Sequence, residues 1–142
     1  MVFPFQVIVS SESETENIAK AFSRELKGGE VIVLIGELGA GKTFFVKKTL
    51  ENFNINWVNS PSFAIANEYD NSFKFIHIDF YRLKTARELY DIGFDDYLNN
   101  DSSIIFIEWG NLFPQVLPLK RIEIKIKMNS NNTREIIITK YA

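Results

Sequence analysis

The stretch from residue 31 to residue 43 constrains this chain most, because an apolar run there gives way to glycines and then to a Lys-Thr pair. Its sequence, VIVLIGELGAGKT, fits the phosphate-loop pattern G-x-x-x-x-G-K-S/T at Gly36, Gly41, Lys42 and Thr43. Glycines let the backbone N–H groups of such a loop face a phosphate chain, and the helix that follows adds its dipole. The pattern therefore predicts that Lys42 binds nucleotide phosphates and that the Thr43 hydroxyl binds Mg²⁺.

The residues on both sides of the loop agree with this prediction. Residues 31 to 35 form a short apolar run rich in β-branched side chains, which is typical of a buried parallel strand. After the loop, residues up to Phe53 recur at helical spacing on one face, with Lys47, Lys48 and Glu51 on the other. An ordinary glycine turn is the alternative, but such a turn requires neither the Lys-Thr pair nor so many glycines.

Length and composition narrow the possible folds and partners. With 142 residues, of which 46% are hydrophobic, the chain is expected to form one domain, residues 1–142, around a sizeable core. The 16 basic residues are balanced by 18 acidic ones, which argues against a broad positive surface for nucleic acid. The absence of cysteine excludes disulfides and thiolate metal sites, and no apolar run approaches the ~18 residues of a membrane span. We therefore expect a cytoplasmic protein without membrane contact.

The remaining segments predict a fold that mixes strands and helices. Apolar runs, alternating or continuous, predict the other strands at residues 5–9, 63–69, 73–80, 103–108, 121–128 and 135–139. Helices are expected from the capping-box pair Ser13 and Glu16 to Gly28, and again over residues 83–98 with a break at Gly93. The expected fold is a single-domain α/β P-loop NTPase with a central, mostly parallel mixed sheet and a C-terminal antiparallel hairpin.

Two acidic residues end apolar strands, where a carboxylate can serve a nucleotide site. Asp79 fits the Walker B role of holding Mg²⁺ directly or through water, although a strand-end aspartate is more often a cap or a turn residue. Glu108 is expected to orient water or to join the metal shell. His77 shares the strand face of Asp79 and is expected to be structural or to bond within the site, since a lone histidine is a poor metal ligand. Trp109 is either a core residue or a ring that stacks on a nucleotide.

Two further segments each allow two interpretations. The polar stretch around Pro61 places Ser60 and Ser62 where phosphate-loop proteins often sense the γ-phosphate, but the same residues also suit a simple turn. The segment from Glu88 to Asp96 is acidic and helical in character. It is either a solvated face or a surface for a partner protein.

Together these motifs resemble the TsaE (YjeE) ATPases, bacterial proteins required for threonylcarbamoyladenosine modification of tRNA. The resemblance covers nearly the whole chain. It rests on GELGAGKT at 36–43, VNSPSF at 58–63, HIDFYRL at 77–83, ELYDIGFDDYL at 88–98 and IEWG at 107–110. The phosphate loop is shared by many families, whereas the other segments, in this order, are far more specific.

The resemblance implies an ATPase that docks on the heterodimer of TsaD and TsaB, whose TsaD subunit modifies adenosine 37 of tRNA. The tRNA would then be reached only through the complex. The resemblance also implies that the phosphates of ATP are held by Glu37, Leu38, Gly39, Ala40, Gly41, Lys42 and Thr43. Adenine would lie near Ser10 to Thr15, which includes Ser11, and near the last strands.

For the chemistry, the resemblance places Thr43 and Glu108 in the Mg²⁺ shell and makes Asp79 necessary for hydrolysis. We therefore expect Lys42, Asp79 and Glu108 to be catalytic, and Thr43, Asp79 and Glu108 to bind the metal. Ser62 is also expected at the nucleotide, with Trp109 beside it. The family usually has threonine at the position of Ser62. Serine keeps the hydroxyl but is less stiff at χ1, so it orders this segment less tightly.

Other nucleotide-binding classes compete with this interpretation. A small-molecule kinase usually needs an arginine-bearing lid, for which a chain with five arginines and no long insertion has little room. A GTPase needs a guanine-reading N/T-K-x-D segment, but Thr139-Lys140 is not followed by that aspartate. An ATP-binding adaptor stays open and would differ by never hydrolysing ATP. We expect an ATPase that is weak without its partners, because the γ-phosphate needs a positive group in trans; Arg82 in cis is the competing account.

Overall fold

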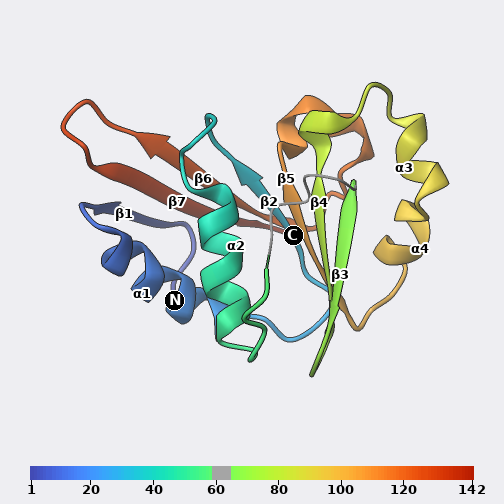
Figure 1. The fold of residues 1–142 in the computed structure, drawn as a ribbon, viewed down its shortest axis with the longest axis horizontal. Helices are drawn as coiled ribbons and strands as arrows, with labels where there is room; N and C mark the ends of the chain where they lie inside the picture. Colours follow the sequence, from blue (N-terminus) through green and yellow to red (C-terminus); the bar gives the residue numbers. More distant parts are fainter. Residues whose placement is uncertain (59–64) are drawn as a thin grey trace.

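A seven-stranded sheet, built from the described residues 1–58 and 65–142 of this computed structural model, carries helices on both faces (Figure 1). Its strands are β1 (Phe5–Val9), β2 (Val31–Ile35), β3 (Ala66–Asp70), β4 (Lys74–Asp79), β5 (Ser103–Glu108), β6 (Arg121–Met128) and β7 (Arg134–Tyr141). The helices are α1 (Glu12–Ser23), α2 (Lys42–Glu51), α3 (Arg87–Asp91) and α4 (Phe94–Leu98), with short 3-10 turns η1 (Phe80–Arg82), η2 (Gly110–Leu112) and η3 (Pro114–Val116).

The strands lie in the order β1-β7-β6-β2-β5-β4-β3. The four central strands, β6, β2, β5 and β4, pair in parallel. At the edges, β3 pairs with β4, β6 with β7, and β7 with β1, all antiparallel. The expected mixed sheet and its C-terminal antiparallel hairpin are confirmed, with parallel pairing in the centre and antiparallel pairing at both edges.

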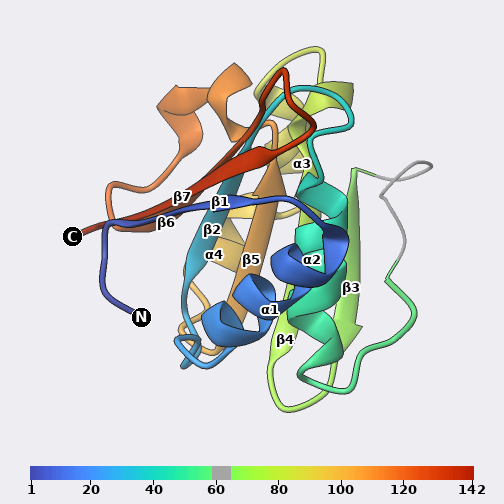
Figure 2. The same cartoon turned by 90° about the vertical axis from the view of Figure 1, so that its left-hand side faces the viewer.

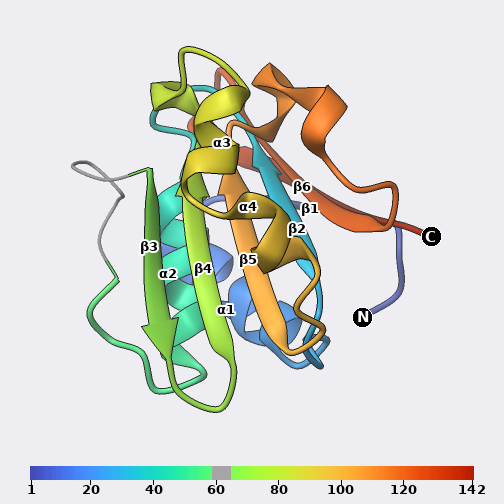
Figure 3. The same cartoon turned by 90° about the vertical axis from the view of Figure 1, so that its right-hand side faces the viewer.

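Each face of the sheet packs against a different set of helices. Helices α1 and α2 cover one face (Figure 2), and α3 and α4 cover the other (Figure 3). Strand β2 shows why both layers are needed, because its alternate residues enter different cores. Ile32 and Leu34 pack toward α1 and α2, whereas Val33 packs toward the α3 and α4 layer.

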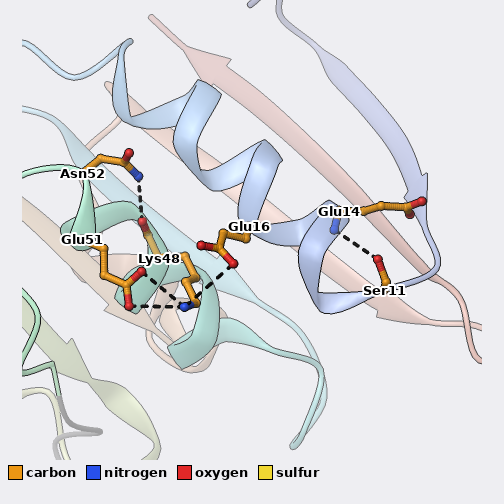
Figure 4. A network of polar contacts seen from close by, with 6 residues as sticks. All are labelled: Ser11, Glu14, Glu16, Lys48, Glu51 and Asn52. Atoms are coloured by element: carbon orange, nitrogen blue, oxygen red, sulfur yellow. Dashed lines mark hydrogen bonds and ion pairs between the residues drawn. The ribbon is translucent and has the colours of Figure 1, made fainter.

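The first helix begins earlier than its sequence indicated. Ser11, not Ser13, is the N-cap, and its Oγ accepts from the backbone N–H of Glu14 at 3.2 Å. The expected capping pair of Ser13 and Glu16 is therefore wrong. Glu16 instead points toward α2, where Lys48 lies between it and Glu51 at 3.9 and 3.3 Å (Figure 4). These ion pairs are exposed or half-buried, so they help to align the two helices more than they stabilise them.

The first helix also ends earlier, at Ser23, and the expected stop at Gly28 is wrong. The glycines there have another purpose. Gly29 has a φ of 90°, and its N–H donates to the carbonyl of Ser103 at 2.9 Å. A Cβ on Gly29 would lie 2.8 Å from the carbonyl oxygen of Asp101. Glycine thus lets the chain approach the start of β5 closely before it enters β2.

The segment from residue 83 to residue 98, expected to be helical with a break at Gly93, contains two short helices. Gly93 lies between α3 and α4 with a φ of 79°, which confirms the expected break. Leu89 and Phe94 enter the core, while Asp91 and Asp95 are exposed. Glu88 differs from these acids, because its carboxylate accepts from the backbone N–H groups at 84 and 85 (2.6 and 3.0 Å). The carboxylate of Glu88 therefore holds the backbone that leads into α3.

Candidate functional site

The carboxyl ends of β2, β4 and β5 meet at one edge of the sheet, where α2 also begins (top of Figure 1). Register places Glu108 beside Leu34 of β2 on one side and beside Asp79 of β4 on the other. A hollow of about 400 Å³ opens here, lined by Leu38, Gly39, Gly41, Lys42, Thr43, Phe44, Asp79, Tyr81, Arg82, Glu108 and Trp109. Most of the residues expected at a nucleotide thus share one hollow.

The loop from residue 36 to residue 43, called the glycine loop below, bends at two glycines. Gly39 and Gly41 have φ values of 81° and 110°, which favour glycine because they lie in the left-handed region. A Cβ on Gly39 would meet nothing within 4 Å, so its conformation, not lack of space, favours glycine there. Ala40 is buried between them, while Glu37 and Leu38 are exposed.

Lys42 is buried, with 4% of its surface exposed, although it carries a charge. Its Nζ donates to the carbonyl oxygens of Gly36 (2.6 Å) and Glu37 (3.0 Å). Burial lowers the pKa of Lys42, and the nearby carboxylates of Glu108 and Asp79 oppose that shift. The ammonium group is therefore held by carbonyl dipoles, with its positive charge directed at the loop.

Glu108 is fixed from two sides. The Thr43 hydroxyl donates to its carboxylate, with both Oε atoms 2.9 Å from Oγ1, and Nε2 of His77 lies 2.5 Å from Oε2. His77 is fully buried, and Glu108 is 5% exposed. His77 therefore orients Glu108, one of the two roles that its strand position allowed. Because Thr43 gives its proton to Glu108, the lone pairs of its oxygen stay free to accept another partner.

Asp79 differs from Glu108 although the two are register neighbours. Its Oδ1 accepts from the N–H of Tyr81 at 2.9 Å, so it caps η1, and it makes no bond to Thr43 among the described contacts. Burial raises the pKa of Asp79, and this outweighs the Tyr81 N–H, which lowers it; the charge of Glu108 raises it further. Asp79 is thus a helix cap, as strand-end aspartates often are, and it also lines the hollow.

Trp109 is half-buried and adopts a left-handed backbone conformation, with a φ of 61°. Its ring centroid lies 4.1 Å from Nζ of Lys42 and 5.0 Å from the ring of Tyr81. The ring therefore covers the lysine through a cation–π contact, and Trp109 is a residue of the hollow. Tyr81, which is 60% exposed and belongs to the HIDFYRL segment, also lines the hollow, although it was not among the expected site residues.

A second hollow of about 240 Å³ lies on the other side of the glycine loop, toward α1 and β7. It is lined by Val9, Ser10, Ser11, Glu12, Thr15, Asn132 and Arg134. We call this second hollow the serine side, after Ser10 and Ser11. The group formed by Thr43, His77, Asp79 and Glu108 is called the carboxylate side. Ser11, which was expected at the nucleotide, lines this second hollow and not the one at the strand ends. Arg134 was missed from the sequence, because a single arginine at a strand start has no distinguishing local pattern.

Ser60 and Ser62 lie outside the described residues, so their expected role at the nucleotide stays a prediction. Arg82 is exposed and lines the first hollow. In the described part of the chain, no group of three or more His, Cys, Asp or Glu side chains forms a metal cage. Nor does any helix in residues 1–58 and 65–142 have the length and apolar content needed to cross a membrane.

The groups that are present fit a magnesium-bound nucleotide. Lys42 offers a buried positive charge at a bent glycine loop, which suits phosphate. Thr43, Asp79 and Glu108 offer hydroxyl and carboxylate oxygens, which are the ligands that Mg²⁺ prefers. A small number of protein ligands is enough for Mg²⁺, because phosphates and waters complete its coordination shell.

Comparison with known families decides among the classes of protein that carry such a loop. The sequence model of the family described as "Threonylcarbamoyl adenosine biosynthesis protein TsaE" matches residues 9–136. This chain belongs to the TsaE family. The resemblance inferred from the motifs is thereby confirmed.

Several TsaE relatives align over most of the chain. The "tRNA threonylcarbamoyladenosine biosynthesis protein TsaE" of Rickettsia typhi is 38% identical over 136 residues, which cover 93% of this chain and 92% of that protein. The protein of the same name from Bacillus subtilis is 40% identical over 128 residues, covering 89% and 79%. The crystal structure of Bacillus subtilis YdiB superposes with a TM-score of 0.81 at 32% identity, covering all of this chain and 88% of that one. This TsaE member therefore shares the fold of a solved relative from end to end.

Proposed function

We propose that this TsaE protein is a Mg²⁺-dependent ATPase of tRNA threonylcarbamoyladenosine biosynthesis. Its relatives carry that pathway in their names. The observation that carries the ATPase proposal is the contact of Thr43 with Glu108 beside the buried Lys42. It brings together the hydroxyl, carboxylate and ammonium groups that phosphate-loop ATPases use, from the start of helix α2 and the end of strand β5.

Each of these groups has a part in hydrolysis. Lys42 binds the β- and γ-phosphates and stabilises the negative charge that develops as the bond from the γ-phosphorus to the bridging oxygen breaks. Glu108 and Thr43 hold the metal position, where Mg²⁺, when bound, neutralises phosphate charge. Asp79 orients the attacking water through Oδ2 and takes up its proton, for which its raised pKa prepares it.

The serine side supports the placement of adenine. Its hollow adjoins the glycine loop, and Ser10, Ser11 and Asn132 offer hydroxyl and amide groups there. The base would then lie between α1 and the turn of the C-terminal hairpin, while the phosphates run along the loop toward Glu108.

The rim of the first hollow supports completion of the site by a partner. Leu38 and Tyr81 are 78% and 60% exposed beside Lys42, an apolar rim that a partner surface can cover. We propose that this partner is the TsaD–TsaB heterodimer, and that tRNA contacts this chain only through the complex. Closure would exclude water and supply positive charge to the γ-phosphate, an effect worth roughly 10³ to 10⁵ in rate.

The test follows phosphate release from Mg-ATP while purified TsaD–TsaB is titrated into this protein. We expect low turnover alone and a large increase with the heterodimer. Lys42→Ala should abolish the increase and weaken ATP binding in calorimetry, because it removes the phosphate-binding charge. Lys47→Ala is the matched control, since Lys47 lies on the exposed face of the same helix. High turnover that the heterodimer leaves unchanged, or a Lys42→Ala variant that binds ATP as the wild type does, would overturn the proposal.

A further inference from the structure

A third hollow lies on the face of the sheet away from α1 and α2, where α3 and α4 pack beside the turn η3 (Figure 3). It has a volume of about 220 Å³, and its lining includes Ala86, Leu89, Tyr90, Phe94, Asp95 and Val116. Most of these side chains are apolar, and Tyr90 is 68% exposed although its ring is large. The outer layer of the fold therefore carries an apolar hollow with an exposed aromatic ring, a combination that is common where another protein binds.

The surroundings of this hollow are acidic. Residues 88–119 contain two glutamates and four aspartates but no lysine, arginine or histidine, and Arg87 is the last basic residue before this stretch. Asp91, Asp95 and Asp96 are exposed, and within the described ranges 1–58 and 65–142 none of them forms an ion pair. Unpaired negative charge beside an apolar hollow is complementary to a partner that carries both positive charge and an apolar side chain.

The hollow is also linked to the first hollow, at the strand ends. The ring of Phe94 lies 6.0 Å from the ring of Phe80, and both residues are buried. Phe80 directly follows Asp79 and begins η1, the turn that also carries Tyr81 on the exposed rim of the first hollow. A partner that covers that rim can therefore continue onto α3 and α4.

We propose that the third hollow docks a basic segment of the partner protein, in which a lysine or arginine lies beside an apolar side chain. The apolar side chain packs against Tyr90, and the positive group faces Asp91 and Asp95. RNA does not fit this surface, because the same carboxylates repel phosphates. This inference rests on the proposed function, in which the partner is the TsaD–TsaB heterodimer, and it names the surface and the chemistry of that contact. Of the two interpretations that the sequence allowed for the acidic segment, it selects the surface for a partner protein.

The experiment measures association and dissociation of the full chain and purified TsaD–TsaB by biolayer interferometry, with Mg-ATP present and at two salt concentrations. Tyr90→Ala should weaken binding by about tenfold or more, mainly through faster dissociation, because it removes a ring that the partner covers. Tyr90→Phe keeps the ring and should bind as the wild type does. Asp95→Lys should weaken binding by a similar factor, mainly through slower association, and its binding should weaken less as salt rises.

Asp70→Lys is the matched control for a reversed charge. Asp70 is exposed and pairs with the first residue of β4, whereas Asp79 is the last residue of that strand. This control should bind the heterodimer as the wild type does. All four variants should remain folded by circular dichroism and should bind ATP with unchanged affinity in calorimetry, because none of the three positions lines either of the first two hollows.

Each other outcome is decisive. A wild-type chain that does not bind the heterodimer overturns this inference together with the proposed partner. If the wild type binds and either Tyr90→Ala or Asp95→Lys binds equally well, this inference alone fails, because the docked segment would not be both apolar and basic. An equal loss in Asp70→Lys also overturns it, since the net charge of the chain would then explain the effect. If Tyr90→Ala does not fold, Tyr90→Gln carries the same test.

Discussion

On the carboxylate side of the glycine loop, His77 and Glu108 are buried, and Thr43, His77 and Glu108 bond to one another, whereas on the serine side Ser10 and Ser11 are exposed and serve the start of α1. Glu108 bonds to the half-buried Thr43 and to the fully buried His77. Ser11 caps α1 by accepting from a backbone N–H. A buried polar network fixes geometry, while a helix cap adds stability to a folded element.

The two sides therefore differ in what they contribute. The lowered pKa of Lys42 and the raised pKa of Asp79 both follow from burial, so these charged groups are held at a cost in folding free energy. Such a cost is expected where chemistry needs charges in place before the ligand arrives. The comparison predicts that mutations on the carboxylate side mainly change turnover, and that mutations on the serine side mainly change stability.

The largest effect should come from Glu108→Gln. It keeps the size of the side chain but removes the charge that fixes Thr43, so we expect turnover to fall on the order of 10²-fold or more while metal-free nucleotide still binds. Phosphate release by the protein with its partners measures this. Glu123→Gln is a matched control, because Glu123 is also buried beside β2 but pairs with Arg121 at 3.0 Å. If both variants lose turnover equally, the loss comes from removing any buried charge. The carboxylate side would then have no specific role in turnover.

A smaller effect, on stability, is expected from Ser11→Ala. Loss of the N-cap of α1 should lower the free energy of unfolding by about 0.5–2 kcal/mol, which urea denaturation of the nucleotide-free protein can measure. Ser13→Ala is the control, since Ser13 is exposed and does not cap the helix. That variant should stay within about 0.5 kcal/mol of the wild type. If Ser13→Ala lowers the free energy of unfolding more than Ser11→Ala does, Ser13 caps the helix as the sequence indicated.

The smallest effect concerns the pH dependence of Asp79. Burial raises its folded pKa above the ordinary value of 3.8, so the folded state binds this proton more tightly than the unfolded state and loses stability as pH rises through that range. Asp79→Asn removes this cost and keeps an oxygen for the Tyr81 N–H. The nucleotide-free variant should therefore match the wild type near pH 3.5 and be more stable at pH 7, by about 0.5 kcal/mol. Lower stability at pH 7 would show that the charge stabilises the fold.

Local patterns predicted much of the fold and the centre of the site. The glycine loop, the strand before it and the helix after it were all predictable, because their signals lie within a few residues of each other. The C-terminal antiparallel hairpin followed from alternation, and the break between α3 and α4 followed from Gly93. Helix ends were less predictable, since Ser11 and Ser13 offer the same chemistry and packing of α1 chose between them.

Sequence by itself determined which residue types are available for a nucleotide: the Lys42 ammonium, the Thr43 hydroxyl and the two carboxylates that end apolar strands. Only the tertiary structure decided how they divide the work. Strand order places β5, and not β4, next to β2, so Glu108 reaches Thr43 while Asp79 caps η1. Arg134 reaches Gly41 only because the C-terminal hairpin folds back beside β2. Such contacts join residues that are far apart in the chain, and the spacing of neighbouring residues carries no information about them.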